Sequence, residues 1–361
     1  MNMLTRPLEP EGSRSPLGLM YIAAMDENTM IWDPLIQGDP IQAIKRIHPR
    51  VVGVTMLTPK RQDSIKILRA AKDDGCVTVA GGAHPSIMYE QMLAKYPFID
   101  YIVVGDGEYS WKMICDWGEG GLYNNRVLKG YIAELDKLPI PAFNKVDMRK
   151  YQQHGVVLSR GCSGHCTYCS TWWVSGKYRF HSEDWLTEEL RQLDRYNIKY
   201  LVWDDDCLTD NPEATYGMIR AMSKFHFTAE GDTRVDKMDE EMVKEFARVG
   251  FTLMAFGIES GSQTILDKIH KNTDLGQAIR VREWCKKYGI RVKALMMTGF
   301  PFETEQTKRE DAEFRARLAP DEWGSVGFVK ILPGTAMYRE YKKEGKITDD
   351  FWLGDEPWMV A

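Results

Sequence analysis

The feature that most limits the fold of this sequence is an alternation between short apolar segments and longer segments with helical periodicity. In the first third of the chain, apolar runs at 30–32, 51–54, 77–80 and 101–104 suit strands that are buried on both faces. A preceding strand has to fit within residues 2–6. Strands that alternate with helices form parallel sheets. The sequence therefore predicts an α/β fold.

The alternation resumes after residue 155 with longer units. Strands are expected at 155–159, 200–203, 227–230, 253–258, 292–297 and 326–331. Helices are expected between them, for example at 182–196, 239–249 and 275–288. Six such units predict a partial (β/α)6 barrel of parallel strands, in which chemistry sits at the carboxyl ends of the strands.

A proline-containing segment separates the two series of strands. Pro139 and Pro141 favour an extended connection. A chain of 361 residues also exceeds one ordinary hydrophobic core. We therefore predict a Rossmann-like domain over 1–135, a linker over 136–150, and a partial barrel with a short carboxyl-terminal extension over 151–361.

The composition limits the compartment and the partners. Hydrophobic residues make up 43% and charged residues 27% of the chain, as in soluble globular proteins. The net charge of −5 lacks the basic footprint of nucleic-acid binders, so no nucleic acid is expected. No apolar run reaches the length of a membrane helix, and the first residues lack a secretory signal. We expect a cytoplasmic protein without membrane contact.

The most specific motif lies directly after the first expected barrel strand. Three of the seven cysteines, Cys162, Cys166 and Cys169, fall within eight residues in the spacing C-x3-C-x2-C. Thiolates are soft ligands that suit iron–sulfur clusters or zinc. A cubane cluster normally takes four cysteines, so three leave one iron open to a small chelating molecule.

A structural zinc site is the alternative interpretation of these cysteines. The fourth ligand would be His154, His165 or His181. Structural zinc sites usually show paired C-x2-C halves, and no second half occurs in this sequence. A fourth cysteine, Cys207, follows the second barrel strand and is interpreted as buried and inert, with contact to a substrate as the alternative.

The cysteine spacing, with the aromatic residue Tyr168 before the last cysteine, resembles the radical S-adenosylmethionine (AdoMet) superfamily. The resemblance implies a [4Fe–4S] cluster held by the three cysteines, with AdoMet chelated to the open iron. One-electron cleavage of AdoMet then yields a 5′-deoxyadenosyl radical. The cofactor performs the difficult step, and the protein positions it.

Other strand ends match the same family. The resemblance implies AdoMet contacts from Tyr168, Asp204, Asp205, Asp206, Arg234, Glu259, Ser260, Gly299 and Pro301. The aspartates would take the amino group, Arg234 the carboxylate, and Glu259 the ribose hydroxyls. For each polar residue alone, a solvated loop or a helix cap is the alternative.

The amino-terminal domain resembles the cobalamin-binding branch of this superfamily. The resemblance implies cobalamin contacts from Thr55, Leu57, Gly81, Gly82, His84, Gly105, Gly107 and Glu108. The Asp-x-His-x-x-Gly signature that supplies a histidine to cobalt elsewhere is absent, so that motif provides no lower ligand. His84, before a proline in a turn, is interpreted as a hydrogen-bonding residue, with a position near cobalamin or ligation of cobalt as alternatives.

The resemblance implies an enzyme, a cobalamin-dependent radical AdoMet methyltransferase. One AdoMet would methylate cobalamin, and the radical from a second would activate an unactivated carbon that takes the methyl group from methylcobalamin. Cyclisation, rearrangement or oxidation without methyl transfer is one alternative, and a zinc-stabilised binding protein is another. The expected partners are a small-molecule or peptide substrate and an electron donor such as flavodoxin or ferredoxin.

Overall fold

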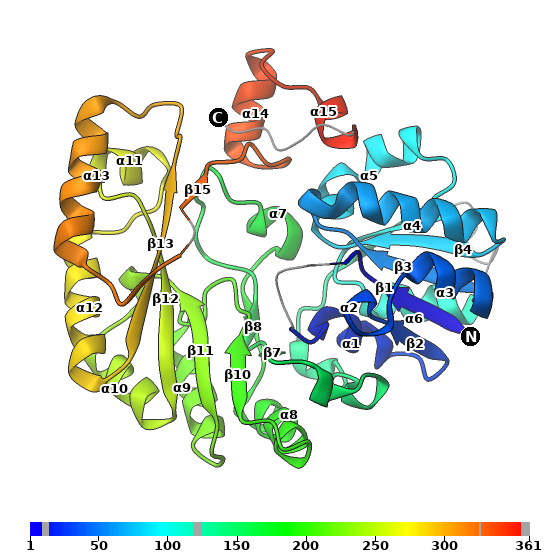
Figure 1. The fold of residues 1–361 in the computed structure, drawn as a ribbon, viewed down its shortest axis with the longest axis horizontal. Coiled ribbons are helices and arrows are strands. Elements are labelled where there is room, and N and C mark those ends of the chain that lie inside the picture. The colour runs from blue at the N-terminus through cyan, green and yellow to red at the C-terminus, as the bar shows by residue number, and fades with distance from the viewer. Residues whose placement is uncertain (9–13, 118–124, 325, 355–361) are drawn as a thin grey trace. The chain divides into compact units, whose positions relative to one another are not determined.

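The computed structural model divides into two compact units (Figure 1). The residues that it describes are 1–8, 14–117, 125–324 and 326–354. The amino-terminal unit contains the described residues of 1–154, 173–176 and 339–357, and the barrel unit contains those of 155–172 and 177–338. The predicted α/β fold is confirmed in both units.

A six-stranded parallel sheet forms the centre of the amino-terminal unit. Its strands are β1 (Asn2–Thr5), β2 (Thr29–Trp32), β3 (Val51–Thr55), β4 (Val77–Gly81), β5 (Tyr101–Gly105) and β6 (Val127–Gly130). They lie in the order β2-β1-β3-β4-β5-β6. The strand order reverses between β1 and β3. In open sheets of this type, ligands bind outside the carboxyl ends of the strands at such a reversal.

Helices cover this sheet between successive strands. They are α1 (Leu17–Ala23), α2 (Pro34–Gln37), α3 (Pro40–Ile47), α4 (Arg61–Asp73), α5 (Ala83–Lys95) and α6 (Glu108–Trp117). Helix α3 begins where the Asp39 side chain accepts from the Ile41 N–H at 2.9 Å, with proline at the first helical position. Packing explains Gly53 in β3, because a Cβ there would lie 2.5 Å from the Trp111 ring of α6.

The segment predicted as a linker packs on the amino-terminal unit. It forms short 3-10 turns at Leu135–Lys137, Phe143–Lys145 and Met148–Lys150. The Lys145 ammonium lies within hydrogen-bond distance of four backbone carbonyls between the end of α1 and the start of β2, among them Ala23 at 2.9 Å. These contacts join the segment to the amino-terminal unit, whose first continuous stretch extends to residue 154.

The end of the described chain also belongs to the amino-terminal unit, whereas the sequence predicted it as an extension of the barrel. It carries α15 (Asp349–Leu353), which follows α14 (Ala336–Lys343). Trp352 of α15 is fully buried, with the Arg61 guanidinium 5.4 Å from its ring. The Gln91 amide donates to Asp349 at 2.9 Å. The amino-terminal unit is therefore assembled from segments that are far apart in the sequence.

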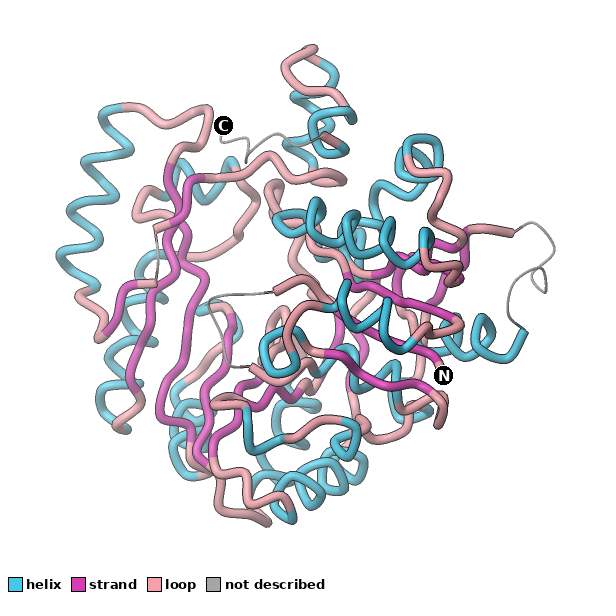
Figure 2. Tube along the Cα trace, turned by 45° about the vertical axis from the view of Figure 1, so that its right-hand side comes forward, coloured by secondary structure: helices cyan, strands magenta, loops and turns pink. Residues whose placement is uncertain are grey.

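The barrel unit is built on a curved sheet, drawn in magenta in Figure 2. Its main path is β14 (Glu322–Trp323), β13 (Arg291–Thr298), β12 (Phe251–Glu259), β11 (Thr228–Thr233), β10 (Tyr200–Trp203) and β7 (His154–Val156). Strand β15 (Gly327–Phe328) pairs with β13. The short strands β8 (Ser159–Arg160) and β9 (Arg179–Phe180) form an antiparallel pair.

The helices of this unit agree with the predicted alternation. They are α8 (Glu183–Arg195), α9 (Pro212–Met222), α10 (Glu240–Arg248), α11 (Gln263–Lys268), α12 (Leu275–Tyr288) and α13 (Glu305–Leu318). Helix α7 (Thr171–Ser175) is divided between the units, with 173–175 in the amino-terminal unit. Helix α8 starts as its sequence predicts, with the Ser182 hydroxyl accepting from the Trp185 N–H at 3.3 Å. Among the described residues, no helix is long and apolar enough to cross a membrane.

The sixth barrel strand differs from its prediction over 326–331. Only Gly327–Phe328 is a strand there. The segment still packs as a strand would, because Val329 and Ile331 are fully buried and the Val329 N–H donates to the Thr298 carbonyl at 2.8 Å. The ladder is short, but the segment closes the edge of the sheet beside β13.

Candidate functional site

The three clustered cysteines lie on the loop from Gly161 to Ser170, which connects β8 with α7 and is called the cysteine loop below. Their side chains are half-buried. Gly161 enters the loop with a φ of +87°, a conformation that glycine adopts without strain. At Gly164 an added Cβ would lie 2.9 Å from Arg234 Nη1 and 3.3 Å from Cys162 Sγ, so the close fold of the loop requires a bare Cα.

Two of the predicted AdoMet residues hold the start of this loop. The buried Asp205 carboxylate accepts from the N–H groups of Leu158 at 3.1 Å and Ser159 at 2.6 Å. The Asp206 carboxylate accepts from the Gly161 N–H at 3.2 Å. Both aspartates therefore fix backbone that leads into the cysteines, and Asp204 is exposed. Their predicted contact with the AdoMet amino group stays a prediction.

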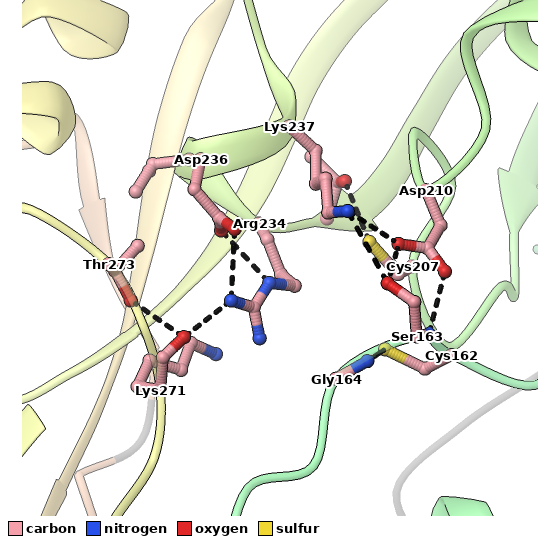
Figure 3. A network of polar contacts seen from close by, with 12 residues as sticks. Cys162, Ser163, Gly164, Cys207, Asp210, Arg234, Asp236, Lys237, Lys271 and Thr273 are labelled. Carbon is pink, nitrogen blue, oxygen red and sulfur yellow. Dashed lines mark hydrogen bonds and ion pairs between the residues drawn. The ribbon is translucent and has the colours of Figure 1, made fainter. Parts of the chain in front are cut away.

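A third aspartate, which the sequence did not single out, holds the middle of the loop (Figure 3). Asp210 accepts from the Ser163 N–H at 2.7 Å and from its hydroxyl at 2.6 Å. Lys237 forms an ion pair with the same carboxylate at 3.2 Å and donates to the Ser163 hydroxyl at 3.3 Å. The loop is thus held from the ends of β10 and β11 by charged side chains.

The thiol of Cys162 has a lowered pKa. A hydrogen bond from the Cys207 thiol lowers the pKa of Cys162 to about 7, and the Gly164 N–H, 3.3 Å from its sulfur, acts in the same direction. Burial raises the pKa of Cys169. A lowered thiol pKa favours the thiolate that binds metal. Cys207 is buried, as predicted, but its contact with Cys162 gives it a place in the site.

Arg234, predicted to bind the AdoMet carboxylate, lies at the end of β11 beside the cysteine loop. Its guanidinium makes a bidentate pair with Asp236, at 2.9 and 3.0 Å, and donates to the Lys271 carbonyl. Its remaining nitrogen, Nη1, lies 3.7 Å from Cys166 Sγ. Arg234 therefore presents one face to the cysteine loop and holds a neighbouring turn with the other.

Glu259 and Ser260 follow β12, where the sequence predicts contact with the ribose. Glu259 has a φ of +70°, which is rare for a residue with a side chain and marks local strain. Its carboxylate pairs with the Lys271 ammonium at 2.9 Å. The Ser260 hydroxyl accepts from the Ser262 N–H at 3.1 Å and so shapes the turn.

Tyr168 connects the cysteine loop with the end of β12. Burial and the nearby Glu259 carboxylate, to which its hydroxyl is hydrogen-bonded, raise the pKa of Tyr168 well above its usual value. The phenol therefore stays protonated and donates to Glu259. Its ring meets that of Phe300 edge-on, with the centroids 6.3 Å apart.

Gly299 and Pro301, predicted to lie along adenine, form the turn after β13. Gly299 has a φ of +80°, and an added Cβ would lie 2.8 Å from the ring of Phe328. Phe328 is 60% exposed, and Pro301 is also exposed. This turn therefore offers bare backbone next to an exposed aromatic ring.

Two of the histidines of the zinc alternative are engaged with aromatic rings, whereas the three cysteines share one loop. Among the described residues, no three His, Cys, Asp or Glu side chains gather around one point that would hold a metal ion. In a cubane each thiolate binds a different iron atom, so half-buried thiols spread along one loop suit it. His165 instead meets Trp172 edge-on, and His181 stacks on Trp185 with centroids 3.6 Å apart.

In the amino-terminal unit, the predicted cobalamin residues gather at the carboxyl ends of β3, β4 and β5. Thr55 and Gly81 are direct neighbours in the β3–β4 register. The Met56 N–H donates to the Gly81 carbonyl at 2.7 Å, which fastens the two turns together. At Gly82, with a φ of +100°, a Cβ would lie 2.9 Å from Met56 and from the Thr55 hydroxyl. Leu57 is 45% exposed.

His84 points away from the exposed edge of these turns. It is 1% exposed, and its Nδ1 lies 3.3 Å from the Thr58 hydroxyl. Burial and the Arg61 charge lower the pKa of His84 to about 3, so its imidazole is neutral. This geometry favours the hydrogen-bonding interpretation of His84.

Gly105, Gly107 and Glu108 form the turn after β5. At Gly105, with a φ of +78°, an added Cβ would lie 2.4 Å from the Gly130 carbonyl oxygen of β6. The Gly107 carbonyl accepts from the Trp111 N–H at 2.8 Å, and Glu108 begins α6 as a buried residue. Gly105 therefore serves close backbone packing. At Gly81, by contrast, only Val103 lies within 4 Å of an added Cβ, at 3.9 Å, which leaves room for a ligand.

Comparison with known proteins agrees with both units. Residues 156–315 match the radical SAM superfamily, and residues 8–112 match the B12 binding domain. The chain is a radical SAM enzyme with a cobalamin-binding domain. The cobalamin-binding domain lies in the amino-terminal unit, and the radical SAM domain is the barrel unit.

Two relatives and one solved structure illustrate the range of this radical SAM enzyme family. An uncharacterized methyltransferase of Pyrococcus horikoshii is 29% identical over 356 residues, covering 90% of this chain and 77% of the relative. The anaerobic magnesium-protoporphyrin IX monomethyl ester cyclase of Rubrivivax gelatinosus is 25% identical over 313 residues, covering 78% of this chain and 56% of the relative. The radical AdoMet methyltransferase TsrM of Kitasatospora setae, solved with cobalamin and a [4Fe–4S] cluster, shares the fold with a TM-score of 0.81 at 16% identity, over 95% of this chain and 78% of that one.

Proposed function

We propose that this radical SAM enzyme is a cobalamin-dependent methyltransferase that methylates an unactivated carbon of a small molecule. The carrying observation is the combination, in one chain, of the three-cysteine loop and the open, glycine-lined strand ends of a cobalamin-binding domain. The names of the Pyrococcus horikoshii relative and of TsrM support methyl transfer.

Different sets of residues would hold the two cofactors and the cysteine loop. When bound, the cluster and AdoMet supply a carbon-centred radical, and cobalamin supplies the methyl group. Cys162, Cys166 and Cys169 would hold the cluster, and Thr55 with Gly81 would lie along cobalamin. The carboxylates behind the cysteine loop fix its backbone amides, so that the thiols meet the cluster without reorganisation of the loop.

The AdoMet contacts are proposed residue by residue. Glu259 would accept from the ribose hydroxyls, because an ionised carboxylate offers about four acceptor positions and the bonds from Lys271 and Tyr168 leave some of them. The turn at Gly299 and Pro301 would lie along the adenine with its bare backbone. An electron donor such as flavodoxin or ferredoxin would reduce the cluster.

The test is a product count on protein purified without oxygen, reconstituted with iron, sulfide and cobalamin, and given AdoMet and a strong reductant. We expect S-adenosylhomocysteine from methylation of the cobalamin and 5′-deoxyadenosine from reductive cleavage. Protein without cobalamin should lose only the first product. Absence of S-adenosylhomocysteine would sink the proposed methyl transfer.

A reaction without methyl transfer is the second candidate, favoured by the match to the Rubrivivax gelatinosus cyclase. In that case the same preparation forms 5′-deoxyadenosine with cobalamin present, and S-adenosylhomocysteine stays at background. The ratio of the two products therefore separates the candidates before the substrate is known.

A further inference from the structure

Lys271 is a buried cation that follows no motif in the sequence. The residue is 4% exposed and lies in the turn between α11 and α12. Its ammonium is 2.9 Å from Glu259 Oε1, and both side chains are largely removed from water. Loss of one partner of such a pair leaves the other charge buried and uncompensated. The orientation of the Glu259 carboxylate therefore depends on Lys271.

The backbone around Lys271 is held in an unusual conformation. His270 and Asn272, on either side, have φ values of +56° and +51°. Glu259, at the other end of the ion pair, also has a positive φ. Residues with side chains adopt this region at a cost, and such strain persists only where surrounding contacts impose it. Three strained residues thus converge on one ion pair.

A bare backbone position provides the room for this pair. At Gly257 of β12, an added Cβ would lie 2.6 Å from Glu259 Oε1 and 2.9 Å from Lys271 Nζ. The register between β12 and β13 shifts between Gly257 and Glu259, which turns the strand end at this point. The strand is therefore shaped around the ion pair.

The same turn, Ile269–Thr273, also fastens the cysteine loop. The Ile269 carbonyl accepts from the Thr167 N–H at 3.0 Å, between the second and third cysteines. The Lys271 carbonyl accepts from the Arg234 guanidinium, whose Nη1 lies 3.7 Å from Cys166 Sγ. Figure 3 shows Lys271 and Arg234 in this arrangement beside the loop.

We propose that Lys271 is the positioning residue of the AdoMet site: it fixes the Glu259 carboxylate for the ribose while its turn fixes the cysteine loop. This inference rests on the proposed use of AdoMet. The proposed role explains why a lysine is buried beside Glu259. It also explains the strained backbone of the turn Ile269–Thr273, which holds Glu259 and the cysteine loop in place together. Lys271 itself need not touch AdoMet.

The experiment measures AdoMet binding by equilibrium dialysis on cluster-loaded protein, together with iron content and thermal unfolding. For K271M we expect retained iron and at least about tenfold weaker AdoMet binding, from loss of the paired carboxylate orientation. The E259Q variant should lose a similar factor. The double variant should bind no more weakly than the weaker single variant, because both changes break one arrangement.

Two further variants make the test specific. K308M removes a lysine from an exposed pair with Glu305 in the same unit and should bind AdoMet like the wild type. G257A displaces the ion pair without removing either charge, so it answers the question if K271M does not fold. We expect weaker AdoMet binding from G257A as well.

The outcomes separate this inference from the proposed function. Wild-type binding by K271M and G257A, or losses that multiply in the double variant, would overturn the role of Lys271 while AdoMet use stands. Wild-type protein that carries iron but neither binds nor cleaves AdoMet would overturn both.

Discussion

The two units carry different chemistry at the same topological position. At the carboxyl ends of β3 to β5, the amino-terminal unit offers glycines, the Thr55 hydroxyl and a neutral buried histidine. At the carboxyl ends of β10 to β12, the barrel unit offers Asp206, Arg234 and Glu259. Lys271 links Arg234 with Glu259, and Asp206 holds the backbone of the cysteine loop. In both units the parallel sheet places loops at the carboxyl ends of its strands, and the residue types in those loops determine which ligand can bind. Exposed glycine backbone suits a large, flat ligand such as the proposed cobalamin. Charged side chains suit the thiolates of the cysteine loop and a zwitterionic ligand such as the proposed AdoMet.

The largest expected effect is the loss of iron from the barrel unit when its cysteine loop is changed. Replacement of Cys162, Cys166 and Cys169 together by alanine should reduce the iron content from about four per chain to background. Iron and sulfide analysis after oxygen-free reconstitution measures it. C285A, a buried cysteine in α12, is the matched control and should keep its iron. Retained iron in the triple variant would contradict the assignment, and cobalamin uptake should be unchanged in both.

The next effect tests the bare backbone of the amino-terminal unit. G105A places a Cβ 2.4 Å from the Gly130 carbonyl oxygen at a positive φ, so we expect a loss of about 1–3 kcal/mol in the stability of this unit. Hydrogen exchange of its peptides measures that loss. G81A is the matched change at a position with open space, and it should fold normally but take up less cobalamin. Equal cobalamin uptake by G81A and the wild type would mean that this edge does not contact the ligand.

The stability of the two units should change with pH in opposite directions. Burial raises the pKa of Asp205 to about 7 from 3.8, so the folded barrel binds the extra proton and loses stability as pH rises from about 4 to 7. Burial lowers the pKa of His84 to about 3 from 6.5, so the unfolded amino-terminal unit binds the extra proton, and that unit gains stability as pH rises from about 3 to 6.5. Hydrogen exchange, resolved by peptide, measures each slope. D205N and H84Q should each flatten the slope of their own unit alone.

The smallest effect concerns one hydrogen bond. C207A removes the thiol that donates to Cys162, so the pKa of Cys162 should rise from about 7 towards its ordinary value near 9. The pH dependence of Cys162 alkylation in cluster-free protein reports it. C285A again serves as the control, and an unshifted alkylation profile in C207A would show that Cys207 does not lower this pKa.

The sequence predicts the parts of the site that depend on spacing. The cysteine motif predicts the cluster ligands because three thiols on one short loop have few alternatives. The alternation of strands and helices places Thr55, Gly81 and Glu259 at strand ends. It does not predict which way a strand-end side chain turns. Asp205 and Asp206 follow β10 as expected, yet their carboxylates bind the cysteine loop, which depends on the path of β8.

Residues without a motif are the ones that the sequence missed. Asp210 and Lys271 look like ordinary surface charges, and only the packing of distant segments shows Lys271 buried against Glu259. The positive φ values of His270 and Asn272 likewise follow from tertiary contacts and have no local signal. The return of α15 to the amino-terminal unit likewise joins segments far apart in the chain and has no local signal in the sequence.

That return has a consequence for how the protein is made. Chains are synthesised from the amino terminus at about 5–20 residues per second, and domains generally fold as they emerge. The pocket of the amino-terminal unit that receives Trp352 can be filled only after nearly all of the barrel has been translated. The first unit to leave the ribosome therefore gains the contacts of α15 with Arg61 and Gln91 only after the barrel has been translated.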